Sequence, residues 1–124
     1  MKVLDTSAWI EYFKGTEKGA KVKCILAEEV VGTSVLTLAE MAKWCVETKS
    51  DWDKVIIQIK ANSNLIPVEE LILIEGGKLY PQLRKIKTKI GLIDVLIYVS
   101  TIFHEAELVT SDTDYAGLAS VLML

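Results

Sequence analysis

The sequence predicts an α/β fold, a three-layer α/β/α sandwich built around a mainly parallel sheet of about five strands. Short apolar segments typical of strands alternate with longer segments whose apolar residues recur at helical spacing. The strand-like segments are apolar on both faces, as in parallel sheets that are covered by helices on each side. The chain has 124 residues, so we expect a single domain over residues 1–124.

The first half of the chain is predicted to contain two strands and four helices. Residues 2–4 and 30–33 are short and apolar, and each is predicted to be a buried strand. Gly15 is a stop signal for the first helix, and Asp51 is a suitable N-cap for the last. The predicted helices cover residues 6–13, 17–29, 37–49 and 51–61.

The second half begins with turn-forming residues at 62–64, followed by a third predicted strand at 65–68. Residues 69–86 have a helical pattern that is interrupted by helix-breaking residues, so we predict a break or kink inside it. The interrupting residues are Gly76, Gly77 and Pro81. The remaining elements are predicted to be a loop at 87–91, an apolar helix at 93–103, a strand at 107–110, a helical turn at 115–118 and a strand at 121–124.

The composition indicates a folded protein and excludes several classes. Hydrophobic residues make up 51% of the chain, which argues against disorder. The net charge of −3 argues against nucleic-acid binding over the whole surface but allows a local basic patch. We expect Cys24 and Cys45 to be reduced thiols in or near the core. Reduced cysteines favour a cytoplasmic location. We find no signal peptide and no membrane-length apolar segment, so we expect no membrane contact.

Four acidic residues stand at strand ends or in apolar surroundings. Asp5 directly follows the first predicted strand and Asp112 follows the fourth, so both are expected at the carboxyl edge of the sheet. Asp94 begins the most apolar helix, and Glu40 lies within an apolar helical segment. Clustered carboxylates without matched basic residues are destabilising unless a divalent cation lies among them. Oxygen ligands suit Mg²⁺ or Mn²⁺.

Each acid alone also has a purely structural explanation. Asp94 fits a helix cap or a first-turn acid favoured by the helix dipole. Asp112 and Asp114 fit turn or N-cap residues, and Glu40 fits a solvent-facing position. Asp5 is the hardest to explain in this way, because it follows a buried strand. The set therefore favours a metal site more strongly than any one of its members does.

The four acids belong to four short motifs along the chain. Each motif alone is unspecific, but together they extend over essentially the whole chain. The motifs cover residues 3–8, 37–41, 91–97 and 108–115. In these segments the sequence resembles the PIN domain, and within it the small VapC-like ribonuclease toxins of type II toxin–antitoxin pairs. Tyr115 and Ser111 differ from the residues common at those positions, but no expected acid is missing.

The resemblance implies an endoribonuclease that depends on Mg²⁺ or Mn²⁺ and cleaves RNA phosphodiester bonds. It implies Asp5 and Asp94 as the main metal ligands, with Glu40 and Asp112 completing the catalytic cluster directly or through bound water. Residues expected to support these ligands by hydrogen bonding or by position are Thr6, Ser7, Thr110 and Asp114.

A basic segment at 84–89 precedes Asp94 and is a candidate for contacts with RNA phosphates. The same charges also fit a solvated helix end, where cations complement the helix dipole. The candidate RNA-binding residues are Arg84, Lys85, Lys87 and Lys89. The resemblance further implies a cognate antitoxin that covers the acidic site, and a homodimer.

Two other functions stay open on the sequence alone. One is a PIN-type nuclease with an RNA-processing or structure-specific role, and a neighbouring antitoxin gene would favour the toxin over it. The other is a catalytically silent module that binds nucleic acid or protein. The four intact acids argue against a silent module.

Overall fold

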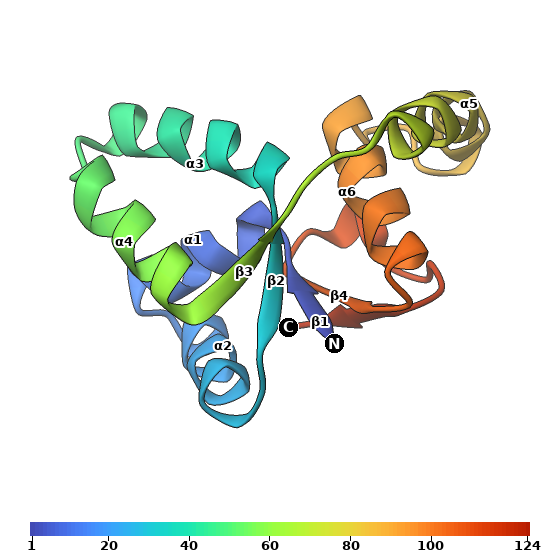
Figure 1. The fold of residues 1–124 in the computed structure, drawn as a ribbon. Helices are drawn as coiled ribbons and strands as arrows, with labels where there is room; N and C mark the ends of the chain where they lie inside the picture. The colour runs from blue at the N-terminus through green and yellow to red at the C-terminus, as the bar shows by residue number, and fades with distance from the viewer.

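A computed structural model describes all residues from 1 to 124 and contains one parallel sheet of five strands (Figure 1). The strand order is β3-β2-β1-β4-β5, and every neighbouring pair is parallel. The chain order reverses between β1 and β4, which creates a crevice at the carboxyl edge of the sheet. The strands are β1 (Lys2–Leu4), β2 (Val31–Ser34), β3 (Ser63–Ile66), β4 (Glu107–Thr110) and β5 (Val121–Met123).

Helices cover both faces of this sheet, so the predicted three-layer α/β/α sandwich is confirmed. Helices α1 to α4 lie on one face, and α5 and α6 lie on the other (Figure 1). A short 3₁₀ turn at Thr113–Tyr115 separates β4 from β5. The helices are α1 (Thr6–Lys14), α2 (Glu17–Glu28), α3 (Val35–Thr48), α4 (Trp52–Asn62), α5 (Glu70–Ile86) and α6 (Leu92–Phe103).

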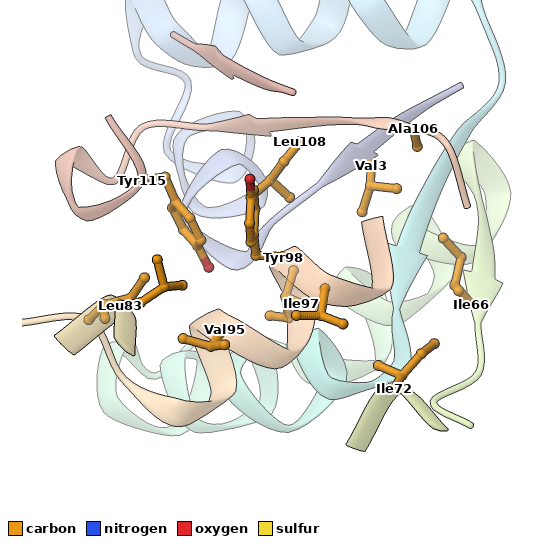
Figure 2. Close-up of a cluster of buried hydrophobic side chains, with 12 residues drawn as sticks. Val3, Ile66, Ile72, Leu83, Val95, Ile97, Tyr98, Ala106, Leu108 and Tyr115 are labelled. Atoms are coloured by element: carbon orange, nitrogen blue, oxygen red, sulfur yellow. The ribbon is translucent and has the colours of Figure 1, made fainter. Parts of the chain in front are cut away.

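Two apolar clusters form the core, one on each face of the sheet. Successive strand residues point to opposite faces, so Val3 and Leu4 of β1 belong to different clusters. On the side of α5 and α6, Val3 and Leu108 face Ile97 and Tyr98 of α6 (Figure 2). The opposite cluster lies beneath α1 to α4. Both faces of the central strands are therefore buried, as their continuous apolar sequence predicted.

Two predicted helix signals are present in the structure. Gly15 ends α1 in a left-handed conformation with φ of 68°, which a residue with a side chain rarely adopts. The side chain of Asp51 accepts a hydrogen bond from the main-chain N–H of Asp53 and caps α4.

Of the predicted break or kink within residues 69–86, the break is wrong, because α5 is one helix from Glu70 to Ile86 that contains Pro81, and the kink stays a prediction. Proline removes one main-chain hydrogen bond of the helix. Packing against α6 overrides that local cost. A Cβ atom at Gly76 would lie 2.5 Å from Cδ2 of Leu96, so the glycine allows the two helices to approach closely.

The predicted turn at 62–64 is also wrong, and the third strand starts two residues earlier than predicted, at Ser63. The polar character of Ser63 is accommodated inside the fold. Its hydroxyl donates to the carbonyl of Ile59 at 2.7 Å and accepts from Thr33 at 2.8 Å. A buried hydroxyl that both donates and accepts a hydrogen bond can occupy a strand. The turn propensity of the local sequence contains no information about such distant partners.

Cys45 is buried as predicted, whereas the prediction for Cys24 is wrong, since this residue lies on the exposed side of α2. Both thiols are free. No helix of the structure combines the length and the apolar character that crossing a bilayer requires.

Candidate functional site

The four acids singled out in the sequence line one cavity of about 190 Å³. Asp5 follows β1, and Asp112 lies just beyond the neighbouring strand β4, so the strand order places both at the crevice. Glu40 comes from α3 and Asp94 from the first turn of α6. The structure thus brings together side chains from four separate parts of the chain. The remaining lining residues are Thr6, Ser7, Ile10, Ile97 and Tyr115.

A larger hollow of about 570 Å³ lies between α1, α2 and α4. Lys23 is the only charged residue that lines it, so it offers no comparable cluster of reactive groups.

Asp5 is the most deeply buried of the four acids, with only 4% of its surface exposed. Its Oδ1 accepts hydrogen bonds from the Ser7 hydroxyl at 2.7 Å and from the N–H of Ala8 at 2.9 Å. Its Oδ2 accepts from the Thr110 hydroxyl at 2.6 Å. Burial raises the pKa of Asp5 to about 6, although the bonds from Thr110, Ser7 and Ala8 oppose that rise. The three hydrogen bonds therefore favour the charged form of Asp5, which burial alone would make less stable.

The same hydroxyls attach the segment after β4 to the start of α1. Thr110 Oγ1 accepts from the N–H of Asp112 at 2.9 Å, and Ser7 Oγ accepts from the N–H of Ser111 at 2.9 Å. Asp112 in turn caps the 3₁₀ turn, because its Oδ1 accepts from the N–H of Asp114 at 2.9 Å. Its Oδ2 accepts no hydrogen bond from the protein. Asp112 therefore acts as a turn residue through Oδ1, while Oδ2 is available to bind a ligand.

Glu40 is half-buried and is held by Thr6, whose hydroxyl donates to Oε1 at 2.6 Å. Burial raises the pKa of Glu40, and the negative charges of Asp94 and Asp112 raise it further, while Thr6 and Lys43 lower it. Oε2 accepts no hydrogen bond from the protein. The solvent-facing explanation for Glu40 is excluded, since its side chain lines the cavity.

Asp94 occupies the third position of α6, and its Oδ2 accepts from the N–H of Gly91 at 2.9 Å. The residue therefore does serve the helix start, as the structural explanation proposed, and it lines the cavity as well. Burial raises the pKa of Asp94, which the Gly91 hydrogen bond opposes and the charges of Asp112 and Asp114 reinforce. Asp114 is not among the lining residues of the cavity.

No lysine or arginine forms an ion pair with any of the four cavity acids. Hydroxyl and main-chain N–H donors are their only hydrogen-bonding partners in the protein. Burial and the surrounding carboxylates also raise the pKa of Tyr115, whose side chain closes one side of the cavity. The cavity is thus a negatively charged site without an internal counter-charge.

The donor set fits a hard divalent cation. Every charged group in the cavity is a carboxylate, which is the ligand type of Mg²⁺ and Mn²⁺. In the structure, no group of three or more histidine, cysteine, aspartate or glutamate side chains converges closely enough to hold a metal ion. The arrangement therefore fits an ion that contacts one or two carboxylates and keeps several waters, which is how Mg²⁺ is usually held.

The basic residues before α6 do not line the cavity. Two of them serve the fold: Arg84 donates to the carbonyl of Ile90, and Lys87 donates to the carbonyl of Ala116. Lys85 and Lys89 are exposed and form no hydrogen bond or ion pair. RNA contacts by these four residues stay a prediction.

Sequence reasoning missed the role of Tyr115 at this site. The side chain is 1% exposed, and its hydroxyl donates to the main-chain carbonyl of Asp94 at 3.0 Å. It lies beside Val95 and Tyr98 in the core (Figure 2). The tyrosine thereby connects the segment that carries Asp112 to the helix that carries Asp94. The only sequence signal was an aromatic residue directly after the last acidic pair.

Comparison with known proteins adds a family and a set of similar folds. The model of the PIN domain family matches residues 2–121. No curated protein matches the sequence.

Several solved toxin structures share the fold. A toxin–antitoxin complex from Klebsiella pneumoniae is 22% identical, with a TM-score of 0.77 over 99% of this chain and 97% of that one. VapC20 from Mycobacterium tuberculosis, a toxin that cleaves the sarcin–ricin loop, is 16% identical, with a TM-score of 0.76 over 98% and 97%. VapBC2 from Rickettsia felis, bound to promoter DNA, is 18% identical, with a TM-score of 0.75 over 99% and 96%.

Proposed function

Because the chain belongs to the PIN domain family, we propose that it is a metal-dependent endoribonuclease, the toxin of a VapBC-type toxin–antitoxin pair. One observation carries this proposal. Asp5, Glu40, Asp94 and Asp112 line a single cavity, and none of them is paired with a basic side chain. The similarity in fold to VapC20, a toxin that cleaves the sarcin–ricin loop, supports the choice of RNA as substrate.

Asp5 and Asp94 are the proposed main ligands of a Mg²⁺ or Mn²⁺ ion. A carboxylate has about four lone-pair positions, and the three hydrogen bonds to Asp5 leave one on Oδ2. Glu40 Oε2 and Asp112 Oδ2, which accept no hydrogen bond from the protein, complete the set through bound water, because no three carboxylates converge on one point. When bound, such an ion supplies an activated water and stabilises charge on the attacking and leaving oxygens of a phosphodiester.

The hydroxyl groups around the cavity hold the carboxylates in the charged, oriented form that ligation requires. Thr110 and Ser7 do this for Asp5, and Thr6 does it for Glu40. Groups that orient metal ligands commonly change metal affinity by about 10- to 100-fold when they are removed. We therefore include these three residues in the proposed site as positioning residues.

The proposed partners are an RNA substrate, an antitoxin and a second copy of the chain. Lys85 and Lys89 are the better candidates for phosphate contacts, because Arg84 and Lys87 are engaged within the fold. The Klebsiella and Rickettsia structures contain toxin–antitoxin pairs, which supports an antitoxin as partner here. Exposed apolar side chains provide surface for protein contacts, and on α5 and α6 they include Leu71, Ile74, Ile102 and Phe103.

The test is cleavage of a mixed RNA pool with Mg²⁺, with Mn²⁺ and with chelator. The variants are Asp5→Asn and a matched control, Asp53→Asn, which removes an exposed carboxylate from α4. We expect metal-dependent cleavage by the wild type and the control and none by Asp5→Asn. Cleavage that persists in chelator or in Asp5→Asn would contradict the proposed site. A folded, antitoxin-free wild type that cleaves no RNA would favour the silent binding module.

A second experiment separates a toxin from an RNA-processing nuclease. The chain is expressed in its host with and without the protein encoded by the neighbouring gene. Growth arrest that the neighbour relieves is the expected result. Active cleavage in the tube with no effect on growth would favour the RNA-processing role.

A further inference from the structure

The peptide group between Ile90 and Gly91 is hydrogen-bonded in two directions. Its carbonyl accepts from Nη1 of Arg84 at 3.2 Å, and its N–H donates to Oδ2 of Asp94 at 2.9 Å. A peptide group is planar and rigid, so its carbonyl and its N–H cannot reorient independently. The arginine and the acid are therefore coupled through one rigid unit.

Both ends of this connection are fixed by further contacts. Arg84 also donates to the Tyr80 hydroxyl at 2.8 Å, and its guanidinium lies 5.6 Å from the centre of the Tyr80 ring. The side chain of Ile90 is fully buried, which anchors the peptide from the other side. Arg84 is exposed, so these contacts hold its guanidinium in one position at the protein surface.

The contact at Asp94 leaves little free space. A Cβ atom added at Gly91 would lie 3.2 Å from Oδ2 of Asp94, closer than most such contacts. The carboxylate therefore rests against the main chain of residue 91, and a reorientation of that peptide would move it. A charged donor on the carbonyl side also polarises the peptide and strengthens the bond that its N–H donates.

We propose that Arg84 is a positioning residue for Asp94, acting through the Ile90–Gly91 peptide and not through RNA. The importance of Asp94 as a metal ligand rests on the proposed function, whereas the coupling itself does not. Lys87 has no equivalent role toward Asp94, because its ammonium group donates to Ala116 in a different segment.

The first test uses the metal-free protein and observes the amide group of Gly91 by NMR. Arg84→Met removes the donor, Arg84→Lys restores a charge, and Lys78→Met removes an exposed charge from the same helix as a control. We expect the Gly91 amide proton to move upfield and to exchange faster in Arg84→Met, less so in Arg84→Lys, and not at all in Lys78→Met. Asp94→Asn provides the reference for a weakened bond.

A second variant tests the coupling if Arg84→Met fails to fold. Tyr80→Phe keeps the guanidinium but removes the hydroxyl that accepts one of its two hydrogen bonds. A smaller change of the Gly91 amide in the same direction is expected. An unchanged Gly91 amide in a folded Arg84→Met, or an equal change in Lys78→Met, would overturn the proposal.

The second test compares Mn²⁺ affinity with RNA binding. Direct partners of metal ligands change affinity by 10- to 100-fold, so a partner one step further away should weaken Mn²⁺ binding by about two- to fivefold. The KM for RNA should stay unchanged in Arg84→Met. A raised KM with unchanged Mn²⁺ affinity would instead assign Arg84 to phosphate contacts. If the wild type binds no metal, the proposed function fails, while the amide measurement still tests the coupling.

Discussion

The Thr110 hydroxyl donates a 2.6 Å hydrogen bond to Oδ2 of Asp5, although the two residues are 105 positions apart. The contact follows from the parallel pairing of β1 with β4, in which Leu4 lies opposite Val109. The residues that follow this pair, Asp5 and Thr110, then lie at the same edge of the sheet. The strand order thus delivers a hydrogen-bond donor to the most buried acid of the site.

Thr110→Val keeps the shape of the side chain and removes this donor. We expect the pKa of Asp5 to rise above its value of about 6, because the hydroxyl that favours the charged form is lost. Mn²⁺ affinity near neutral pH should fall by about 10- to 100-fold. Calorimetric titration measures the Mn²⁺ affinity, and Thr88→Val, a substitution of an exposed threonine, is the control. Equal affinity in the two variants would show that Thr110 does not support the site.

Asp5→Asn should stabilise the metal-free protein near neutral pH. The folded protein holds the Asp5 proton up to a pKa of about 6 and the unfolded chain only up to 3.8, so wild-type stability falls as the pH rises between these values. The rise in pKa corresponds to at most about 3 kcal/mol. Part of that gain is offset because the Thr110 hydroxyl loses its acceptor.

Urea unfolding of Asp5→Asn and wild type at about pH 4.5 and about pH 7.5 measures this difference. The advantage of the variant should be small at the lower pH and larger at the higher one. A variant that is less stable than wild type at both values would show that the buried charge is well compensated.

Metal binding should strengthen as the pH rises through about 6. Carboxylates must lose their protons to bind a cation, and burial raises the pKa of Asp5, Glu40 and Asp94. Mn²⁺ titrations at about pH 5, 6 and 7 should show a steep gain in affinity that levels off above neutrality. A flat profile over this range would mean that these acids are not the ligands.

Local sequence patterns predicted the fold class and the four acids, since both depend on features that lie close together in the chain. An acid directly after a buried strand, such as Asp5, is visible without knowledge of its neighbours. The role of Tyr115 was not predictable in this way, because its contact with Asp94 depends on how the segment after β4 packs against α6. Arg84 was predicted as an RNA-binding residue from its charge alone. Its hydrogen bond to the carbonyl of Ile90 could not be predicted, because it depends on the fold.

The break predicted in α5 is wrong for the same reason, because packing between helices cannot be read from the local sequence. Gly76 and Gly77 are equivalent as helix breakers in the sequence, but only Gly76 meets a side chain of α6. Gly76→Ala places a Cβ 2.5 Å from Cδ2 of Leu96, whose side chain must shift, and this cost should offset the gain of about 1 kcal/mol that alanine brings to a helix. Gly77→Ala meets nothing within 4 Å and should stabilise it by up to about 1 kcal/mol. Thermal unfolding compares the two, and equal effects would contradict close packing of α5 on α6.

Binding of a divalent ion is the property on which all the proposed chemistry depends. Calorimetric titration of Mn²⁺ into the wild type, Asp5→Asn and Asp53→Asn near neutral pH tests it directly. We predict saturable binding by the wild type and by Asp53→Asn, and binding at least about tenfold weaker in Asp5→Asn. A folded wild type without saturable binding, or an Asp5→Asn variant that binds equally well, would contradict a metal site at the four acids.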